Sequence, residues 1–361
     1  MIFFVFAIST VVEYVVHFND PRSLKYLRLA FALLAIFTYT IIAGFREVGF
    51  SPDDLNYLDI FSHSINGGGG VKETTNEPIF MFLNKFVGFF STDVSNLFLL
   101  FAFFTALFTA SSFLLSSKLT ALSFTLYFSH VFLYRDMIQI RAGLSYSLAM
   151  FIIGYYLIYI NKKRYVYPAT ILPGLIHTSG FLTLLVPFLS KLKYSVKLSL
   201  ILLLFSFSLG LINFGKYISD ALSFFDFGSV QSAVNTYVLT KNQFNYELGL
   251  LNPTTLKQIF WLLLFNYNFK YIKDDNGSSL FLWMYTISTC ILLLLNDYST
   301  LAARLASFFS VSEFFLIPLL IVNARKKSLI FFGLALLYCV AMLLLNLFSK
   351  NLFSGYHFNF Y

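Results

Sequence analysis

The amino-acid sequence predicts an all-α, polytopic integral membrane protein, and three features of its composition carry that prediction. Of the 361 residues, 58% are hydrophobic and only 12% are charged, about half the charged fraction of a typical soluble chain. The mean hydropathy is +0.74. Apolar stretches of roughly 20 residues, enough helix to cross the ~30 Å hydrocarbon core of a bilayer, recur along the chain. A soluble enzyme is thereby excluded, and the aromatic content of 20% excludes a disordered chain.

About ten of these stretches are long and apolar enough to be predicted as membrane-spanning helices. In chain order they are residues 2–18, 27–45, 94–116, 119–134, 138–160, 198–214, 254–272, 279–296, 300–323 and 328–348. Two further apolar segments are irregular: residues 77–90 are short and begin with Glu77-Pro78, and residues 165–190 contain three prolines. Broken helices at membrane depth persist only where they are buried in protein or line a wet cavity. Both segments are therefore predicted to be irregular or re-entrant.

The distribution of basic residues predicts which side of the membrane each loop faces. The chain has 25 Lys and Arg against 17 Asp and Glu, a net charge of +8. If each irregular segment enters and leaves on one side, fifteen bases gather on a single face: Arg22, Lys25, Arg28, Lys118, Lys162, Lys163, Arg164, Lys191, Lys193, Lys197, Lys270, Lys273, Arg325, Lys326 and Lys327. Cytoplasmic loops are rich in Lys and Arg, so that face is predicted to be cytoplasmic, and ten crossings place both termini outside. We therefore predict one transmembrane domain over residues 1–361, with large outer loops at residues 46–76 and 215–253.

Four arginines lie at or inside the outer ends of predicted helices: Arg46, Arg135, Arg141 and Arg304. An arginine within the bilayer costs ~2.5–3.5 kcal/mol on insertion scales, so it must face a partner or a wet cavity. Arg135 and Arg141 are six residues apart in a link that has almost no loop. Because the planar guanidinium fits phosphate oxygens, these residues favour a clamp for an anionic lipid or a pyrophosphate. The alternative is an interfacial ion pair of Arg135 with Asp136, with Arg141 reaching up to the interface.

Four titratable side chains are candidates for proton transfer. Asp53 and Asp54 follow a proline, where the alternative role is to cap a helix N-terminus. Glu77 precedes the first irregular segment, whose helix it could equally cap. His177 lies in the middle of the second, where the interrupted helix favours a cavity over a satisfied core histidine. No His-Glu-x-x-His or Asp-x-Asp pattern occurs, so the sequence predicts chemistry without a metal or a cofactor.

These segments, in this order, resemble the EpsG-like branch of the Wzy polysaccharide polymerases of bacteria. The motifs that carry the resemblance are Arg46 with Asp53/Asp54 and Tyr57, Glu77-Pro78-Ile79-Phe80 with Leu83-Asn84, Arg135-Asp136-Met137-Ile138 with Arg141, Ile176-His177-Thr178-Ser179, and Arg304-Leu305-Ala306-Ser307-Phe308. The resemblance covers roughly residues 30–320. This chain departs from the family pattern at Ile176, where the family has Phe, and in the separation of Gln139 from Arg141, which the family has as an adjacent pair.

The resemblance implies a membrane core like that of the GT-C glycosyltransferases, in the bacterial cytoplasmic (inner) membrane. It implies a polymerase that joins oligosaccharide repeat units, carried on undecaprenyl pyrophosphate, at the outer leaflet. The outer arginines would grip the pyrophosphate leaving group, and Asp53, Asp54 or Glu77, ahead of His177, would deprotonate the acceptor sugar. Tyr57 would stack on a sugar. The implied partners are the lipid-linked donor and acceptor, membrane lipids, and a chain-length regulator and flippase of the same pathway, with no nucleic acid.

Two other functions stay open on the sequence. A ligase that moves finished glycan from the same carrier onto lipid A core would use the same donor chemistry. A transporter or flippase would use the broken segment 165–190 as its substrate site. Deletion strains separate the two enzymes, because loss of a polymerase leaves one ligated repeat unit and loss of a ligase leaves none.

Overall fold

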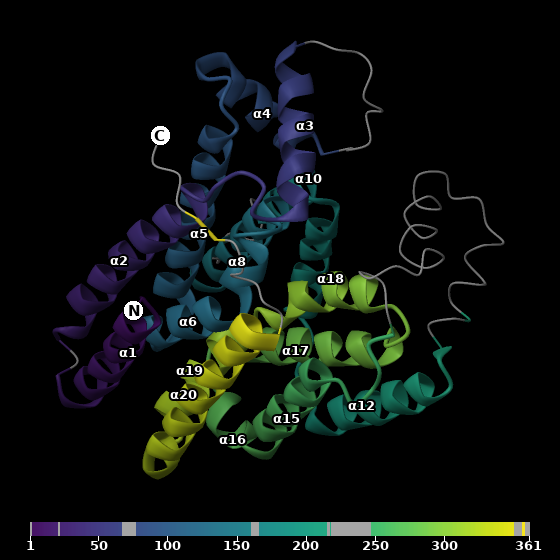
Figure 1. Ribbon diagram of the computed structural model, residues 1–361. Coiled ribbons are helices and arrows are strands. Elements are labelled where there is room, and N and C mark those ends of the chain that lie inside the picture. The colour runs from purple at the N-terminus through teal and green to yellow at the C-terminus, as the bar shows by residue number, and fades with distance from the viewer. Residues whose placement is uncertain are drawn as a thin grey trace. The chain divides into compact units, whose positions relative to one another are not determined.

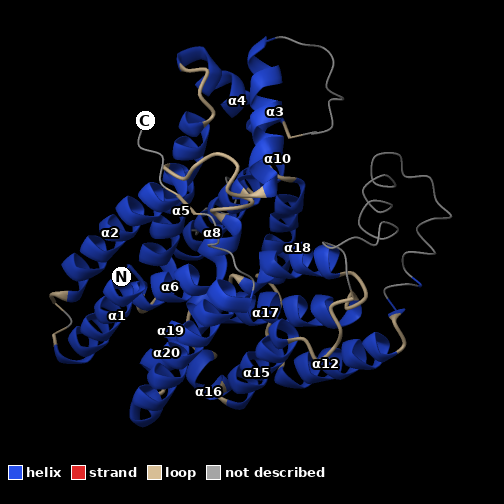
Figure 2. Ribbon diagram, viewed as in Figure 1, coloured by secondary structure: helices blue, strands red, loops and turns tan. Residues whose placement is uncertain are grey.

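The computed structural model describes residues 2–20, 22–66, 77–159, 166–214, 217, 247–349 and 356–357. Every regular element in these ranges is a helix (Figure 2), which confirms the all-α prediction for them. The chain divides into two compact units, one formed by Met1–Val186 with Ile317–Tyr361 and the other by Pro187–Leu316. Most of the predicted outer loop at 215–253 and the end of the loop at 46–76 lie outside the described residues.

The first unit contains the elements on which most of the predicted site residues lie. Its helices are α1 (Ile2–Asn19), α2 (Leu24–Gly44), α3 (Pro52–Asn66), α4 (Pro78–Phe90), α5 (Ser95–Ser116), α6 (Thr120–Tyr127), η1 (Phe128–Phe132), α7 (Leu133–Arg135), α8 (Ile140–Tyr159), α9 (Val166–Ala169), α10 (Leu172–Ile176), η3 (Thr178–Leu185), η5 (Arg325–Lys327), α20 (Ser328–Leu344) and η6 (Leu345–Ser349). Within this unit α5 packs between α2 and α8 (Figure 1). A Cβ at Gly44 would lie 2.8 Å from the Leu99 side chain, so glycine lets the C-terminal end of α2 approach α5.

The second unit contains α12 (Val196–Leu211), α15 (Pro253–Tyr267), α16 (Phe269–Ile272), α17 (Ser278–Leu294) and α18 (Ser299–Ser310). Two further helices, α11 (Val186–Leu189) and α19 (Glu313–Asn323), run from one unit into the other. In the second unit Lys257 donates to Oε2 of Glu313 at 3.2 Å, and the hydroxyl of Tyr285 donates to the same oxygen at 3.3 Å. Lys257 and Glu313 both lie within apolar stretches that are predicted to span the membrane, but their pairing was not predicted.

Helix bounds agree with the apolar stretches in most places, and one helix was not predicted. The structure splits residues 165–190 into α9, α10, η3 and α11, as the prolines indicated. It also places α3 within residues 46–76, which the sequence analysis treated as loop. Pro52 stands at the first position of α3, two acidic residues occupy its first turn, and Tyr57 and Phe61 bury one face. These are ordinary features of a helix start, and the apolar face supplies the packing that a short helix needs.

Several helices are long and apolar enough to cross a membrane. Among the residues that the structure describes, four meet that criterion by length and composition, namely α1, α2, α5 and the stretch Arg325–Phe348, which contains α20. The pair α18 and α19, bent by 41°, makes a fifth if it is one span. Large apolar side chains such as Phe37, Leu204 and Leu337 are mostly exposed, as expected on surfaces that face lipid. The described helices thus support a multi-pass membrane protein, and the count of ten spans stays a prediction.

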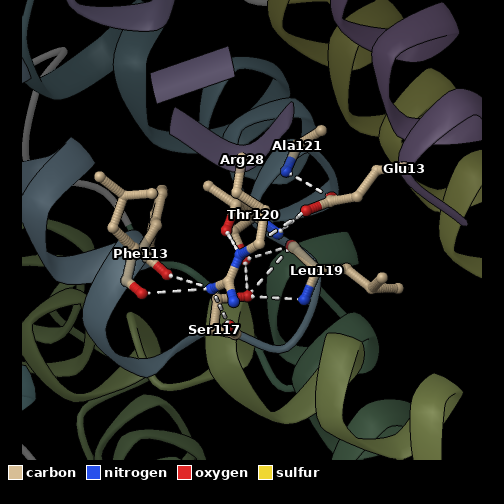
Figure 3. Close-up of polar contacts among 9 residues, drawn as sticks. Glu13, Arg28, Phe113, Ser117, Leu119, Thr120 and Ala121 are labelled. Atoms are coloured by element: carbon tan, nitrogen blue, oxygen red, sulfur yellow. Dashed lines mark hydrogen bonds and ion pairs between the residues drawn. The ribbon is translucent and has the colours of Figure 1, made fainter. Parts of the chain in front are cut away.

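A charged clamp holds the ends of α5 and α6 that the sequence places on the cytoplasmic side. The Glu13 carboxylate of α1 accepts the backbone N–H groups of Thr120 and Ala121, at 2.8 and 2.7 Å, in the first turn of α6. The Arg28 guanidinium of α2 donates to the hydroxyl of Thr120 at 2.6 Å, to the carbonyl of Ser117, and to two more carbonyls in the last turn of α5 (Figure 3). An acid at a helix start and a base at a helix end each match the local helix dipole.

Candidate functional site

Three side chains from separate parts of the sequence meet in the first unit. Glu77 precedes α4, Arg141 is the second residue of α8, and His177 lies between α10 and η3. Nη1 of Arg141 donates to Oε2 of Glu77 at 2.8 Å, and Nδ1 of His177 lies 2.7 Å from Oε1 of the same carboxylate. The backbone N–H of Thr178 also donates to Oε1, at 3.3 Å. We call Glu77, Arg141 and His177 the central cluster.

The helix break positions His177. His177 directly follows the last residue of α10 and has extended backbone, at φ −150° and ψ 133°. The following η3 packs so closely on α10 that a Cβ at Gly180 would lie 2.4 Å from the carbonyl of Pro173. Ser145 of α8 donates to the same carbonyl at 2.8 Å. The break is therefore tied to the helix that carries Arg141, and the imidazole is held beside Glu77.

The Arg141 guanidinium lies against two aromatic rings. Its Cζ is 5.0 Å from the ring centroid of Phe80 and 5.4 Å from that of Tyr57, and both rings belong to a buried apolar cluster. Burial raises the pKa of Tyr57 to about 12, so the phenol stays neutral. The side chains of Arg141, His177 and Glu77 are 22%, 17% and 6% exposed. The side chains of Arg141 and His177 are thus partly exposed, whereas that of Glu77 is buried.

Glu77 is ionised in this setting. Burial by itself raises the pKa of its carboxyl, but the hydrogen bond with His177 and the charge of Arg141 outweigh that effect, so the pKa lies below its usual range. An ionised carboxylate only accepts hydrogen bonds, so it holds a proton on Nδ1 of His177. In a neutral ring the lone pair is then on Nε2.

Arg135, the last residue of α7, lies close to the central cluster. Its Nη1 donates to the amide oxygen of Gln139. The amide nitrogen of Gln139 donates in turn to the hydroxyl of Tyr134 at 3.1 Å. The guanidinium also lies 5.0 Å from the ring centroid of Tyr146 on α8. Tyr146 in turn accepts a hydrogen bond from Ser179, two residues after His177, at 3.3 Å. Arg135 and the central cluster therefore share one region of the unit.

Asp136 is the first residue of the hairpin link that joins α7 to α8. The hydroxyl of Tyr127 is 2.9 Å from each of its two carboxylate oxygens. A Cβ at Gly143 would lie 2.8 Å from Oδ1 of Asp136, which shows how closely α8 passes. Asp136 is 5% exposed. Its position fits a role in holding the hairpin, and Tyr127 was not predicted as its partner.

Arg46 and Asp54 form a second ion pair, and both side chains are completely buried. Nη2 of Arg46 donates to Oδ1 of Asp54 at 2.8 Å, and Nη1 donates to the carbonyl of Ala43 at 2.7 Å. The backbone N–H of Ser51 donates to Oδ2 of Asp54 at 3.1 Å, the capping contact that the sequence allowed as the alternative to a base. The guanidinium lies 4.2 Å from the ring centroid of Phe98. This pair joins the end of α2 to the start of α3.

The remaining predicted residues are Asp53, Arg304 and Tyr57. Asp53 is half-buried in the first turn of α3. Arg304 lies on α18 in the second unit, whereas the other predicted site residues lie in the first. Tyr57 is 3% exposed and contacts Arg141, so it is placed to support that side chain. Tyr146 was not predicted as a site residue, although the serines on either side of it mark a polar interruption in an apolar helix.

Together these groups provide two chemical capacities. The arginines offer planar N–H donors that suit phosphate oxygens. An imidazole oriented by a carboxylate is a common arrangement for accepting a proton from a hydroxyl.

Comparison with known proteins assigns the family. AmsC, an amylovoran biosynthesis protein of Erwinia amylovora, is 26% identical to this chain over 322 residues, which cover 84% of the chain and 82% of AmsC. No solved structure matches the chain. The model of the EpsG family matches residues 29–360, nearly the whole chain. The resemblance drawn from the sequence motifs is confirmed: the chain belongs to the EpsG family.

Proposed function

We propose that this protein is a polymerase that joins oligosaccharide repeat units, each carried on undecaprenyl pyrophosphate, into a surface polysaccharide. The proposal places the reaction at the outer leaflet of the cytoplasmic membrane. Membership of the EpsG family supports it, as does the similarity to an amylovoran biosynthesis protein. The observation that carries it is the central cluster, because one partly exposed group of side chains combines an arginine with a carboxylate–imidazole pair.

In this proposal Arg141 binds the pyrophosphate of the donor; Arg135 is 4% exposed and bonded to Gln139, so it is not assigned a direct contact. Guanidinium groups form charge-assisted hydrogen bonds with phosphate oxygens and stabilise the negative charge that develops on a leaving group. The contacts of Arg141 with the rings of Tyr57 and Phe80 fix the plane of its guanidinium. Arg46 is not assigned to the clamp, because its side chain is completely buried against Asp54.

The proton acceptor in the proposal is Nε2 of His177, with Glu77 as the residue that orients the ring. The acceptor sugar hydroxyl loses its proton to Nε2, and its oxygen forms a new bond to the anomeric carbon of the donor glycan. The bond from that carbon to the phosphate oxygen breaks, and its electron pair leaves with undecaprenyl pyrophosphate. The product is a longer glycan on the acceptor lipid. Asp54 is not given this role, because its carboxylate is buried and bonded to Arg46 and Ser51.

Complementation of a deletion strain tests the proposal. The wild-type gene is expected to restore long polysaccharide ladders, and Arg141→Ala is expected to leave single repeat units, with elongation reduced at least ~100-fold. Lys85→Ala is the matched control, since Lys85 is an exposed base on the neighbouring α4 and is expected to leave the ladder unchanged. Normal ladders from Arg141→Ala, with the variant present in the membrane, would refute the clamp. Transport of lipid-linked units into vesicles without elongation would support a flippase instead.

A further inference from the structure

The carboxylate of Glu77 binds the same arginine that the proposed function assigns to the donor. Oε2 accepts from Arg141 at 2.8 Å, while Oε1 is engaged by His177 at 2.7 Å and by the N–H of Thr178 at 3.3 Å. Both oxygens are therefore occupied in this structure. A pyrophosphate that approaches Arg141 meets a guanidinium that already holds an anion from its own chain.

The arrangement around Arg141 favours an exchange of anions over a movement of the arginine. The rings of Phe80 and Tyr57 lie against the guanidinium, and Tyr57 is 3% exposed within the buried cluster. The Arg141 side chain is 22% exposed, which leaves access for an entering anion, whereas the Glu77 side chain is only 6% exposed. The guanidinium can thus keep its place while its partner changes.

We infer that Glu77 acts as a built-in competitor for the donor site, an inference that rests on the proposed function. Before the donor binds, the carboxylate of Glu77 accepts the hydrogen bond from Arg141. When the pyrophosphate of the lipid-linked donor binds, it takes over Arg141, and the carboxylate of Glu77 keeps its contacts with His177 and the N–H of Thr178. A carboxylate that no longer shares its charge with an arginine stabilises the imidazolium more strongly, so the base becomes effective only after the donor has bound.

This coupling has a chemical consequence for the order of events. With the donor absent, the positive charge of Arg141 offsets the negative charge beside His177, and the ring is a weaker base. With the donor present, the imidazole gains basicity at the moment when a sugar with a good leaving group is in place. The device therefore orders the reaction, with the donor first and the deprotonation of the acceptor second.

Binding and elongation by the purified, full-length protein in lipid nanodiscs test the inference. The probe is undecaprenyl pyrophosphate, with inorganic pyrophosphate in a parallel arm to distinguish recognition of the phosphates from recognition of the lipid. Glu77→Gln removes the competing charge and is expected to lower the Kd for the probe about tenfold, equivalent to ~1.4 kcal/mol. The same variant is expected to elongate glycan at least ~100-fold more slowly, because His177 loses the charge that supports it. The control is Glu47→Gln, which removes an exposed charge from the same unit and is expected to change neither value.

The outcomes separate this inference from the proposed function. If wild-type binding requires Arg141 but Glu77→Gln binds no more tightly, the competitor is refuted and the polymerase proposal stands. If Glu77→Gln binds more tightly yet elongates at the wild-type rate, the coupling to His177 is refuted. If the wild-type protein does not bind the probe, or if Arg141→Ala binds it equally well, the clamp and the competitor both fail. Glu77→Asp is the second variant should Glu77→Gln not be recovered as a folded protein. Its shorter side chain cannot span Arg141 and His177 together, and about threefold tighter binding is expected.

Discussion

Replacing Asp54 with alanine removes one half of an ion pair that has no access to solvent. Both side chains of the Arg46–Asp54 pair are 0% exposed. The substitution takes away the hydrogen bond from Arg46 at 2.8 Å and the two bonds from Ser51 at 3.1 and 3.0 Å. The guanidinium would keep its bond to the carbonyl of Ala43 but would have lost its balancing charge.

The expected loss is large for a single substitution. Leaving one charge of a buried pair without its partner costs about 3–5 kcal/mol. A typical domain is stable by about 5–15 kcal/mol, so the loss is a considerable share of the total. Asp53→Ala is the matched control, because Asp53 is the adjacent, half-buried acid in the same helical turn. Its loss removes an acid from the first turn of α3, and the weakened interaction with the helix dipole costs ~0.3–1 kcal/mol.

The measurement is unfolding by sodium dodecyl sulfate, followed by far-ultraviolet circular dichroism of the purified protein. The double variant Arg46→Leu with Asp54→Ala removes both charges and is expected to recover about half or more of the stability lost by Asp54→Ala, because no unpaired buried charge remains. The reasoning fails if Asp54→Ala is no more destabilising than Asp53→Ala. It also fails if the double variant is no more stable than Asp54→Ala alone.

Two further predictions concern the hairpin and the central cluster. Gly143→Ala places a Cβ 2.8 Å from Oδ1 of Asp136 and is expected to destabilise the protein by ~1–3 kcal/mol and to shorten the polysaccharide ladder. Gly333→Ala, where nothing lies within 4 Å, is expected to gain up to ~1 kcal/mol of helix propensity, and equal melting temperatures for the two variants would contradict this reading. For Glu77, whose pKa lies below the usual 4.5, the ion pair stabilises the fold above that pH and loses its effect as the pH falls below it. The difference in melting temperature between wild type and Glu77→Gln should therefore shrink as the pH falls below about 4.5, a range in which an imidazole is already protonated; a difference that kept growing below that pH would refute the assignment.

Much of the fold could be predicted because apolar length is a local property of the sequence. The apolar stretch at 94–116 became α5, Ser95–Ser116. The prolines around His177 indicated the helix break that the structure contains. α3 was missed because its composition is polar overall, and only the packing of Tyr57 and Phe61 against other helices makes it favourable.

The candidate site was predictable as a set of residues but not as a set of contacts. Glu77, Arg141 and His177 each stood out as charged or titratable groups in apolar or broken segments. Their pairing did not, because Glu77 is 64 residues from Arg141 and 100 from His177, and no periodic pattern links positions that far apart. The same holds for Asp136, since nothing near it in the sequence distinguishes Tyr127 from the other aromatic residues of that helix.

The contacts of Glu13 and Arg28 with the ends of α5 and α6 have a consequence for biogenesis. The N–H of Thr120 is made 107 residues after the carboxylate of Glu13 that accepts it, and its hydroxyl is made 92 residues after Arg28. When α1 and α2 leave the ribosome, the helix ends that these two charges bind do not yet exist. The first two helices therefore cannot reach their final packing as they are inserted and must wait for the α5–α6 hairpin. Insertion of this chain and its folding are thus separate events at the N-terminus, with Glu13 and Arg28 joining them once residue 121 has been synthesised.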